Sequence, residues 1–379
     1  MKRRDFLKLC AATAAAGTGL LGIRRFTSQD KNDGIIAAGN NGDLQEAYYY
    51  RTLADDEVQC ELCFRGCRIP EGKTGFCRVR KNEDGTLYSQ VYGRPSAVNV
   101  DPIEKEPMHH FHPGSQILCV GTASCNFRCK FCHNWHLSQR DVDEVQRVHS
   151  LPPEEVVQRA ENQGAPSISF TYNEPTVFYE YMYDIASLAQ DSGLNVIFHS
   201  NGGLRQEPLQ DLLQNIDAVT VDLKAFTHDF YEEICQARRD PVLDSLKTIE
   251  KEGAWLEIVN LVLPEHNDDP KKIREMAAWI NEALNPDVPL HFSRFSPSYK
   301  MTDLSSTPVE TLENCRRIAR EEGLNHVSIG NVPGHEANST FCPECGEKII
   351  DRFHFTVNNI NMEDGRCGYC GSSIAGVWR

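Results

Sequence analysis

The sequence predicts an α/β protein whose core is a TIM-type β/α barrel or part of one, with a small Cys-rich segment before it and a zinc ribbon after it. Three observations predict this fold. The 379 residues are 40% hydrophobic and 25% charged, as in globular proteins with a sizeable core. From Ile117 onward, short apolar runs alternate with helix-like segments, and most of the 15 cysteines fall into three groups.

The charge balance narrows the classes of partner. The chain has 39 Lys and Arg against 54 Asp and Glu, which gives a net charge of −15. Proteins that bind nucleic acids or anionic membranes generally need a basic face that displaces counterions. We therefore predict no nucleic-acid partner.

The first 25 residues are typical of a twin-arginine signal. They contain RRDFLK at residues 3–8, followed by the uncharged stretch Leu9–Ile23. That stretch has 15 residues, whereas a membrane-spanning helix needs roughly 20. The pattern predicts export to the periplasm or the outer face of the membrane without a stable membrane span. A chance pair of arginines in a cytoplasmic protein is the alternative, and residues 26–56 are expected to be a linker.

A Cys-rich segment is predicted over residues 57–110. Its cysteines follow the pattern C-x2-C-x3-C-x9-C: Cys60, Cys63, Cys67 and Cys77. Four thiolates so close in sequence favour a metal over disulfides in a chain of this length. Zinc, a second iron–sulfur cluster and redox-active thiols all remain open.

The barrel core is predicted over residues 111–335. Its strands are the apolar runs Ile117–Gly121, Ser167–Thr171, Asn195–His199, Ala218–Leu223, Leu256–Leu263, Leu290–Phe295 and Val327–Ile329. Helix-like segments between them include residues 152–164, 176–193 and 268–284. Polar clusters follow five of these runs directly. Since parallel strands end at one edge of the sheet, we expect these clusters to meet at one mouth.

The first of these clusters holds the triplet Cys125, Cys129 and Cys132, in the pattern C-x3-C-x2-C. Three thiolates can bind three irons of a [4Fe–4S] cluster and leave the fourth iron open to another ligand. Zinc and three unconnected thiols are the alternatives, but structural zinc usually takes four protein ligands.

The triplet, with Phe131 before its last cysteine, resembles the signature of the radical S-adenosylmethionine (SAM) superfamily. The resemblance implies that the methionine part of SAM binds the open iron. An electron from the cluster then cleaves SAM, and the resulting 5′-deoxyadenosyl radical takes a hydrogen atom from a substrate.

The resemblance also implies cofactor-binding roles for Phe131 and for polar residues after later strands: Glu174, Ser200, Asn201, Asp222, Lys224, His291 and Arg294. Glu174, in TYNEPT, would receive the methionine ammonium, although Tyr-Asn-Glu stands where the superfamily usually has Gly-Gly-Glu. Asp222 and Lys224 resemble the Asp-Leu-Lys of pyruvate formate-lyase activating enzymes. The alternative for each is an ordinary polar group at a barrel rim, and the catalytic residues stay unknown.

The tail, residues 336–379, contains two CxxC turns formed by Cys342, Cys345, Cys367 and Cys370. Four thiolates in two such turns predict a closed tetrahedral zinc site. Rubredoxin-like iron and free thiols are the alternatives. The isolated Cys119, Cys235 and Cys315 are expected to be buried core residues.

The order of these motifs, with DPIEKEP at residues 101–107, resembles the radical SAM enzyme of the AmmeMemoRadiSam system, related to pyruvate formate-lyase activating enzymes. The resemblance implies an electron donor and favours a protein substrate, while modification of a small molecule remains open. An iron–sulfur electron-transfer or metal-binding module without radical chemistry is the main alternative. An interaction protein built on the zinc ribbon is another.

Overall fold

The computed structural model describes residues 44–145 and 150–378. The predicted signal, residues 1–25, and residues 26–43 of the predicted linker lie outside the described part. All described residues belong to one structural unit of the chain. No helix within them is long and apolar enough to cross a membrane.

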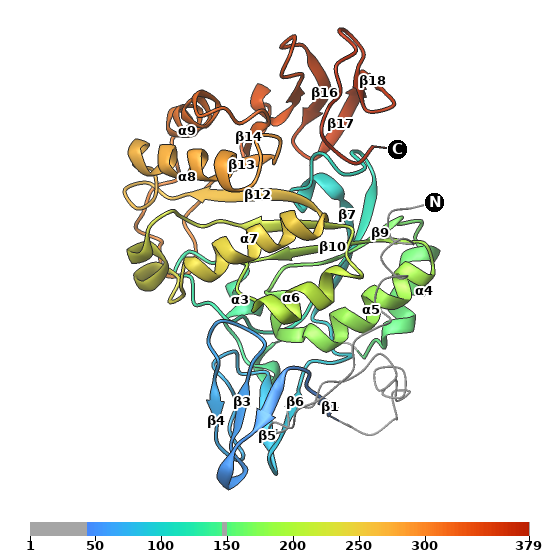
Figure 1. Ribbon diagram of the computed structural model, residues 1–379, viewed down its shortest axis with the longest axis vertical. Helices are drawn as coiled ribbons and strands as arrows, with labels where there is room; N and C mark the ends of the chain where they lie inside the picture. Colours follow the sequence, from blue (N-terminus) through green and yellow to red (C-terminus); the bar gives the residue numbers. More distant parts are fainter. Residues whose placement is uncertain (1–43, 146–149, 379) are drawn as a thin grey trace, which may run out of the picture. The chain divides into compact units, whose positions relative to one another are not determined.

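An eight-stranded sheet forms the core, in the order β14-β13-β12-β11-β10-β9-β8-β7 (Figure 1). Its members are β7 Ala97–Pro102, β8 Gln116–Gly121, β9 Ser167–Phe170, β10 Asn195–Ser200, β11 Ala218–Asp222, β12 Trp255–Val262, β13 Leu290–Arg294 and β14 Val327–Gly330. Strands β8 to β14 are parallel, and β7 is antiparallel to β8. All seven predicted strands are confirmed. The segment 57–110 adds β7, which was not predicted.

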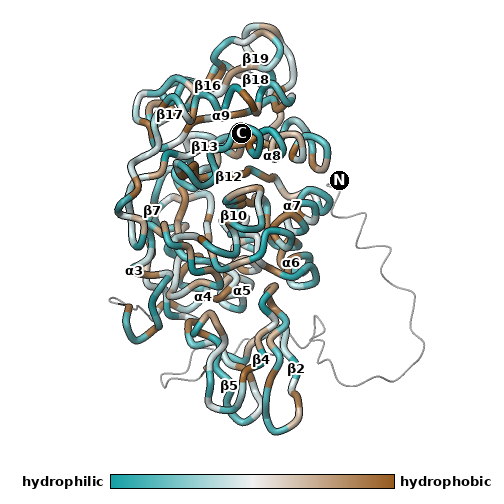
Figure 2. Tube along the Cα trace, turned by 90° about the vertical axis from the view of Figure 1, so that its left-hand side faces the viewer, coloured by the Kyte–Doolittle hydropathy of each residue, from teal (hydrophilic) through white to brown (hydrophobic). Residues whose placement is uncertain are grey.

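The parallel strands β8 to β14 are apolar along most of their length because both faces are covered. Figure 2 shows apolar segments gathered in central strands such as β10 and β12, with polar ones on the helices. The helices are α3 Trp135–Ser138, α4 Pro153–Asn162, α5 Tyr179–Asp191, α6 Gln206–Leu213, α7 Asp240–Glu252, α8 Pro270–Ala283 and α9 Val309–Glu321. Shorter helical turns are η1 Ala54–Asp56, η2 Ile103–Lys105, η3 Val142–Glu144, η4 Pro175–Phe178, η5 Phe230–Ile234 and η6 Glu336–Asn338.

Helix α8 shows how the sequence sets a boundary. The Asp269 carboxylate accepts a hydrogen bond of 2.9 Å from the backbone N–H of Lys271, and Pro270 occupies the first turn. The predicted helix at residues 268–284 is confirmed. The predicted core residues Cys119, Cys235 and Cys315 are also confirmed as buried.

The sheet is open, since its two edge strands, β7 and β14, do not pair with each other in the described part of the chain. The core is therefore the partial form of the predicted architecture. A C-terminal ribbon made of β15 Thr340–Phe341, β16 Lys348–Phe353, β17 Thr356–Ile360, β18 Met362–Glu363 and β19 Arg366–Cys367 is attached to this core.

Arg352 of β16 connects the ribbon to the segment after β7. Its guanidinium donates to the backbone oxygen of His109 at 2.6 Å, and its Nε lies 3.7 Å from a carboxylate oxygen of Glu104. Both side chains of this ion pair are fully buried. The last strand-like residue, Val377, also donates a backbone hydrogen bond of 2.7 Å to His110. The ribbon is thus joined to the core through buried polar contacts.

The Cys-rich segment forms two small antiparallel sheets together with the residues just before it, in the orders β1-β6-β5 and β2-β3-β4. Their strands are β1 Gln45–Glu46, β2 Tyr50–Thr52, β3 Val58–Cys60, β4 Arg68–Ile69, β5 Arg80–Glu83 and β6 Thr86–Ser89. Residues 45–56, predicted as the end of a linker, are instead part of this folded unit, because they supply β1, β2 and η1. Arg80 of β5 pairs with Glu180 of α5, and both side chains are buried. The same carboxylate accepts a 2.7 Å hydrogen bond from the backbone N–H of Tyr48. A buried ion pair thus fixes this segment to the core.

Replacing Arg352 by Ala should lower the free energy of unfolding by about 3–5 kcal/mol, because Glu104 would keep a buried charge without its partner. Lys348→Ala is the control, since that lysine pairs with Asp351 on the partly exposed surface of the same strand. Urea unfolding of metal-loaded protein checks the difference. Equal midpoints for the two variants would contradict it.

Candidate active site

The cysteine triplet lies in the loop after β8, at one end of a cavity of about 360 Å³. Cys125 and Cys129 are buried, Cys132 is half-buried, and all three line the cavity. Seven of the eight predicted cofactor-binding residues line it with them: Phe131, Glu174, Ser200, Asn201, Asp222, Lys224 and His291. The strand-end clusters therefore meet at one mouth, as expected.

Asn173 holds the backbone of the triplet loop. Its side-chain oxygen accepts a 2.8 Å hydrogen bond from the N–H of Thr122, and its amide nitrogen donates to the carbonyls of Ala123 and Ser124. Ser124 has a positive φ of 73°, which an L residue adopts only where its surroundings favour it. Asn173 thus keeps the loop in a conformation that brings its thiols to the cavity.

Glu174 is buried, and its carboxylate accepts hydrogen bonds from neighbouring loops. Oε1 receives the hydroxyls of Ser200 and Thr176 and the N–H of Thr176, whereas Oε2 receives the N–H of Asn201 at 2.8 Å. Burial raises the pKa of this carboxyl, and the hydrogen bonds oppose that rise. Oε2 has a single donor in this arrangement, so it retains capacity to accept a cation.

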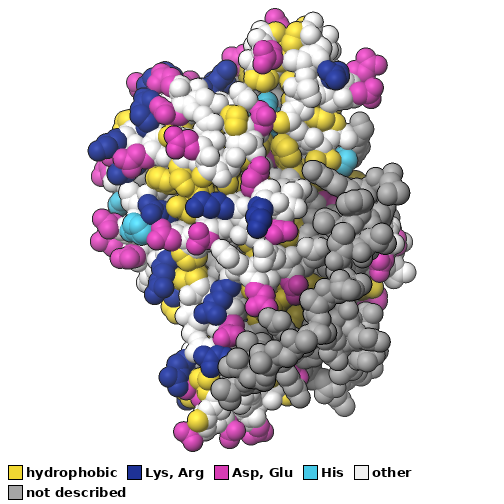
Figure 3. Space-filling model, viewed as in Figure 1, with side chains coloured by type: hydrophobic (Ala, Val, Ile, Leu, Met, Phe, Trp, Pro, Cys, Tyr) yellow, Lys and Arg dark blue, Asp and Glu magenta, His cyan; other side chains and the backbone are white. Residues whose placement is uncertain are grey.

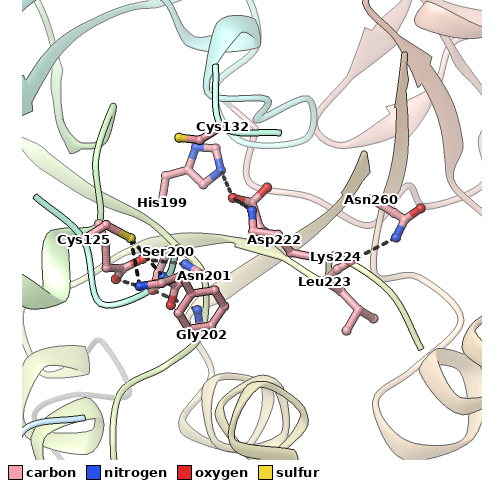
Figure 4. A network of polar contacts seen from close by, with 12 residues as sticks. Cys125, Cys132, His199, Ser200, Asn201, Gly202, Asp222, Leu223, Lys224 and Asn260 are labelled. Carbon is pink, nitrogen blue, oxygen red and sulfur yellow. Dashed lines mark hydrogen bonds and ion pairs between the residues drawn. The ribbon is translucent and has the colours of Figure 1, made fainter. Parts of the chain in front are cut away.

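Asn201 connects Glu174 to the triplet, and Figure 4 shows its side chain beside Cys125. Its amide nitrogen donates to Asn126 Oδ1 at 2.8 Å and lies 3.7 Å from the sulfur of Cys125, while its side-chain oxygen accepts from the N–H of Gly203. The side chain is therefore held by several bonds. Ser200 is likewise engaged, since its hydroxyl also accepts the N–H of Gly202.

A row of alternating charges runs from Glu106 through His199 and Asp222 to Lys224, and the last three of these residues line the cavity. Figure 4 shows the part from His199 to Lys224. His199 lies 3.7 Å from a carboxylate oxygen of Glu106 and 3.6 Å from one of Asp222, and Lys224 Nζ lies 2.8 Å from Asp222.

Burial opposes a charge on His199, but attraction to Asp222 and Glu106 outweighs it and raises the pKa of the imidazole to about 10. Burial also opposes the charges on Asp222 and Lys224. The attraction between these two groups nevertheless lowers the pKa of Asp222 and raises that of Lys224. The row is therefore fully charged at neutral pH, and the ammonium of Lys224 lies 5.9 Å from the ring of Phe131.

His291 lies in a buried network deeper in the cavity. Its Nε2 is 2.7 Å from Glu257 Oε2, and its Nδ1 is 2.6 Å from the hydroxyl of Ser328. Burial would raise the pKa of Glu257, but the hydrogen bond from His291 and other donors lower it to about 2. Arg294 does not line the cavity, and its Nε donates to the carbonyl of Thr307 at 2.8 Å.

Several site residues were not singled out by sequence reasoning: Glu106, Asn173, His199 and Glu257. A signal for some of them exists in the sequence. Glu257 interrupts the apolar run of β12 with a charge, and a charge inside a buried strand needs a partner. His199 ends the apolar run just before Ser200. Glu106 lies within DPIEKEP, which was noted only for the family resemblance, and it follows β7, a strand that was not predicted.

The ribbon sulfurs of Cys342, Cys345, Cys367 and Cys370 all lie within 4.8 Å of one another. The separations Cys342–Cys370 and Cys345–Cys367 are both 3.7 Å. Four thiolates on a tetrahedral zinc ion, with Zn–S bonds of about 2.3 Å, would be separated by about 3.8 Å. The ribbon is thus a four-cysteine metal-binding group with spacing that fits zinc.

The sequence comparisons identify the class of protein. The profile of the radical SAM superfamily matches residues 120–277, which include the triplet, Glu174 and the charged row from His199 to Lys224. An uncharacterised protein of Methanocaldococcus jannaschii is 43% identical over 333 residues, covering 87% of this chain and 99% of its own. The chain therefore belongs to the radical SAM superfamily and is a radical SAM enzyme, a class that uses a [4Fe–4S] cluster and SAM.

More distant relatives include proteins named as activating enzymes. The pyruvate formate-lyase-activating enzyme of Clostridium pasteurianum is 22% identical, covering 52% of this chain and 87% of its own. A putative glycyl-radical enzyme activating enzyme of M. jannaschii is 24% identical over 45% of this chain and 71% of its own. Among solved structures, a radical SAM methyltransferase from Sphaerobacter thermophilus has a TM-score of 0.46 at 16% identity, covering 59% of this chain and 68% of that one.

Replacing Asn173 by Ala should make the cluster labile. The buried N–H of Thr122 and carbonyl of Ser124 would lose their partner, at a cost of about 1–3 kcal/mol for each group. Anaerobic iron release to a chelator should accelerate. Asn195→Ala is the matched control, because that amide donates only to the carbonyl of Pro166 at the far end of β10. Equal release rates would show that Asn173 does not hold the loop.

Proposed function

We propose that this chain binds a [4Fe–4S] cluster through Cys125, Cys129 and Cys132 and cleaves SAM reductively in the cavity beside it. When bound, these two groups supply a 5′-deoxyadenosyl radical that removes a hydrogen atom from the substrate. The observation that carries the proposal is the meeting of three thiols and a buried carboxylate, Glu174, around one cavity.

The donor set fits these cofactors. Three thiols on one loop leave one iron of a cubane without a protein ligand. Glu174 lines the cavity, and its Oε2, with one hydrogen-bond donor, suits an ammonium group. Ser200 and Asn201 act as positioning residues for this carboxylate, because both donate to it.

The charged row from Glu106 to Lys224 has a different role from that of Glu174. Lys224 pairs with Asp222, and its ammonium lies 5.9 Å from the centre of the Phe131 ring. Phe131 directly precedes the last cysteine of the triplet. We infer that Asp222 and Lys224 orient polar groups of the cofactor or substrate. His291 lies deeper, fully paired with Glu257 and Ser328, and we assign it the positioning of the cavity floor.

We propose that the substrate is a partner protein, from which the radical removes a hydrogen atom. We also propose that the electron donor is a low-potential protein. The support is the similarity to proteins named as activating enzymes. An electron-transfer module without radical chemistry is the alternative. A protein that only carries electrons does not need a cavity of about 360 Å³ beside its three cysteines. This cavity therefore favours the enzyme.

On the part of the face in Figure 3 that described residues form, Lys and Arg side chains are interspersed with Asp and Glu. For location, we propose export by the twin-arginine route, supported by RRDFLK at residues 3–8. That route moves folded proteins, so a cluster could be inserted before transport.

The proposed reaction is tested with the anaerobically reconstituted, reduced protein and SAM. The wild type should release 5′-deoxyadenosine, and Cys125→Ala, Cys129→Ala and Cys132→Ala should each abolish this product. Cys315→Ala, which removes a buried thiol of α9 far from the cavity lining, should keep full cleavage. A wild type that holds its cluster but neither forms product nor changes its EPR spectrum with SAM would favour the electron-transfer module.

The proposed export is tested by cell fractionation of the full chain in its host. The wild type should appear in the periplasmic fraction, and Arg3→Lys/Arg4→Lys should remain in the cytoplasm, because the exporter distinguishes the arginine pair from equal charge. Lys8→Arg is the charge-matched control and should be exported. Cytoplasmic wild type would refute export.

A further inference from the structure

The N-terminal cysteine set, Cys60, Cys63, Cys67 and Cys77, surrounds one small cavity. All four residues line it, together with the apolar side chains of Leu62, Ile69 and Val177. Cys60 is on β3, and the other three lie in the loops around β4. A pocket with four thiols and an apolar wall is a typical metal site, because thiolates are ligands and the apolar wall excludes water.

The spacing of these sulfurs differs from that in the ribbon. Among the described residues, the ribbon alone has three or more potential ligand atoms all within 4.8 Å of one another. The N-terminal set does not meet that limit, and neither does the triplet. Thiolates on a single zinc ion are held about 3.8 Å apart, whereas those of an iron–sulfur cubane bind different irons and lie farther apart. In exceeding this limit, the N-terminal set is like the triplet and unlike the zinc-like ribbon.

The N-terminal set is also joined directly to the triplet loop. The hydroxyl of Ser124 donates to the carbonyl of Cys77, and Arg65 Nε donates to the carbonyl of Asn126 at 2.5 Å. Asn126 follows Cys125 in the triplet loop and also lines the cavity of the N-terminal set. One residue next to a triplet ligand therefore forms part of both sites.

A second connection runs through the loop after β10. The N–H of Phe64 donates to the carbonyl of Gly203 at 3.0 Å, and the backbone of Cys63 pairs with that of Leu204 in an isolated antiparallel β-bridge. Gly203 in turn donates to the side chain of Asn201, which contacts Cys125. The two cysteine sites are thus held in a fixed relation through backbone contacts.

Arginines compensate the charge that four thiolates would bring. Arg80 is a charged neighbour of Cys60 and Cys77, and Arg128 is a charged neighbour of Cys77. Arg65 has cysteines of both sites as neighbours, among them Cys63 and Cys125. These cations lie around and between the sites, where anionic clusters would be stabilised.

We propose that Cys60, Cys63, Cys67 and Cys77 bind a second iron–sulfur cluster, of the [4Fe–4S] type, that passes electrons to the cluster of the triplet. In each transfer, the second cluster is oxidised by one electron and the triplet cluster is reduced by one electron. No bond or proton changes. A low-potential one-electron donor protein then reduces the second cluster again. The relay role depends on the proposed function, but the metal site does not.

The decisive variant is Cys125→Ala/Cys129→Ala/Cys132→Ala in the full chain, reconstituted anaerobically and analysed for iron, acid-labile sulfide and zinc. It should keep about half of the wild-type iron and sulfide, since one of two [4Fe–4S] clusters remains. Its reduced EPR signal should not respond to SAM. A variant without iron, with or without additional zinc, would overturn the proposal.

Two further variants complete the test. Cys60→Ser/Cys63→Ser should lose the other half of the iron and keep the SAM-responsive signal. It should still cleave SAM with dithionite but lose cleavage with a flavodoxin-class donor. Undiminished cleavage with that donor would overturn the relay. Cys342→Ser/Cys345→Ser is the matched control and should lose zinc alone.

The test stays informative if a variant fails to fold, because wild-type iron content alone distinguishes one cluster from two. It also separates this proposal from the proposed function. Failure of the function appears as a wild-type spectrum that SAM does not change, whereas failure of the second site appears as the loss of all iron from the triplet variant.

Discussion

The candidate site depends on holding a loop of irregular backbone at the end of β8. The loop carries three thiols, which a helix would spread along about 10 Å of its axis and a strand would divide between its two faces. Its own residues supply few backbone hydrogen bonds, so the amide of Asn173 supplies three partners from the next strand's end. The adjacent residue, Glu174, is fixed by the following loop. Two neighbouring residues after β9 thus hold the cluster loop and present the carboxylate beside it.

Buried charges elsewhere follow the same rule that each must have partners. Arg80 with Glu180, Arg352 with Glu104, and the row from Glu106 to Lys224 all place opposite charges together out of water. Such pairs contribute little net stability compared with apolar packing, but breaking one leaves a costly lone charge. Their value here is positional, because they fix the Cys-rich segment, the ribbon and the cavity wall to one sheet.

Much of the core could be predicted because its determinants are local. Seven apolar runs identified seven strands, and the spacing of the cysteines identified the triplet and the ribbon. The antiparallel strand β7 was missed because AVNVDP carries polar residues and none of its six residues is fully buried. Glu106, next to that strand, was missed with it. The partners of His199 and Glu257 are distant in sequence, so no local pattern could reveal them.

The resemblance-based roles are unequal in the structure. Glu174 and Lys224 face the cavity with groups available to a ligand, whereas the nitrogens of His291 are both engaged within the protein. Arg294 follows the same strand yet bonds to Thr307 outside the cavity lining. Strand position predicts which residues end near the mouth, but the choice between cavity and outer side depends on the twist of the sheet and on neighbouring loops.

The hairpin between β16 and β17 brings the ribbon to the cavity of the candidate active site. His354 and Phe355, at its tip, line the same cavity as the cysteine triplet, so a domain folded around its own four sulfurs supplies part of the wall. A metal that binds only the folded ribbon shifts the equilibrium toward that fold by mass action. The position of His354 and Phe355 in the cavity wall is therefore linked to metal occupancy of the ribbon. The supply of that metal consequently affects how well the cavity is shielded from solvent.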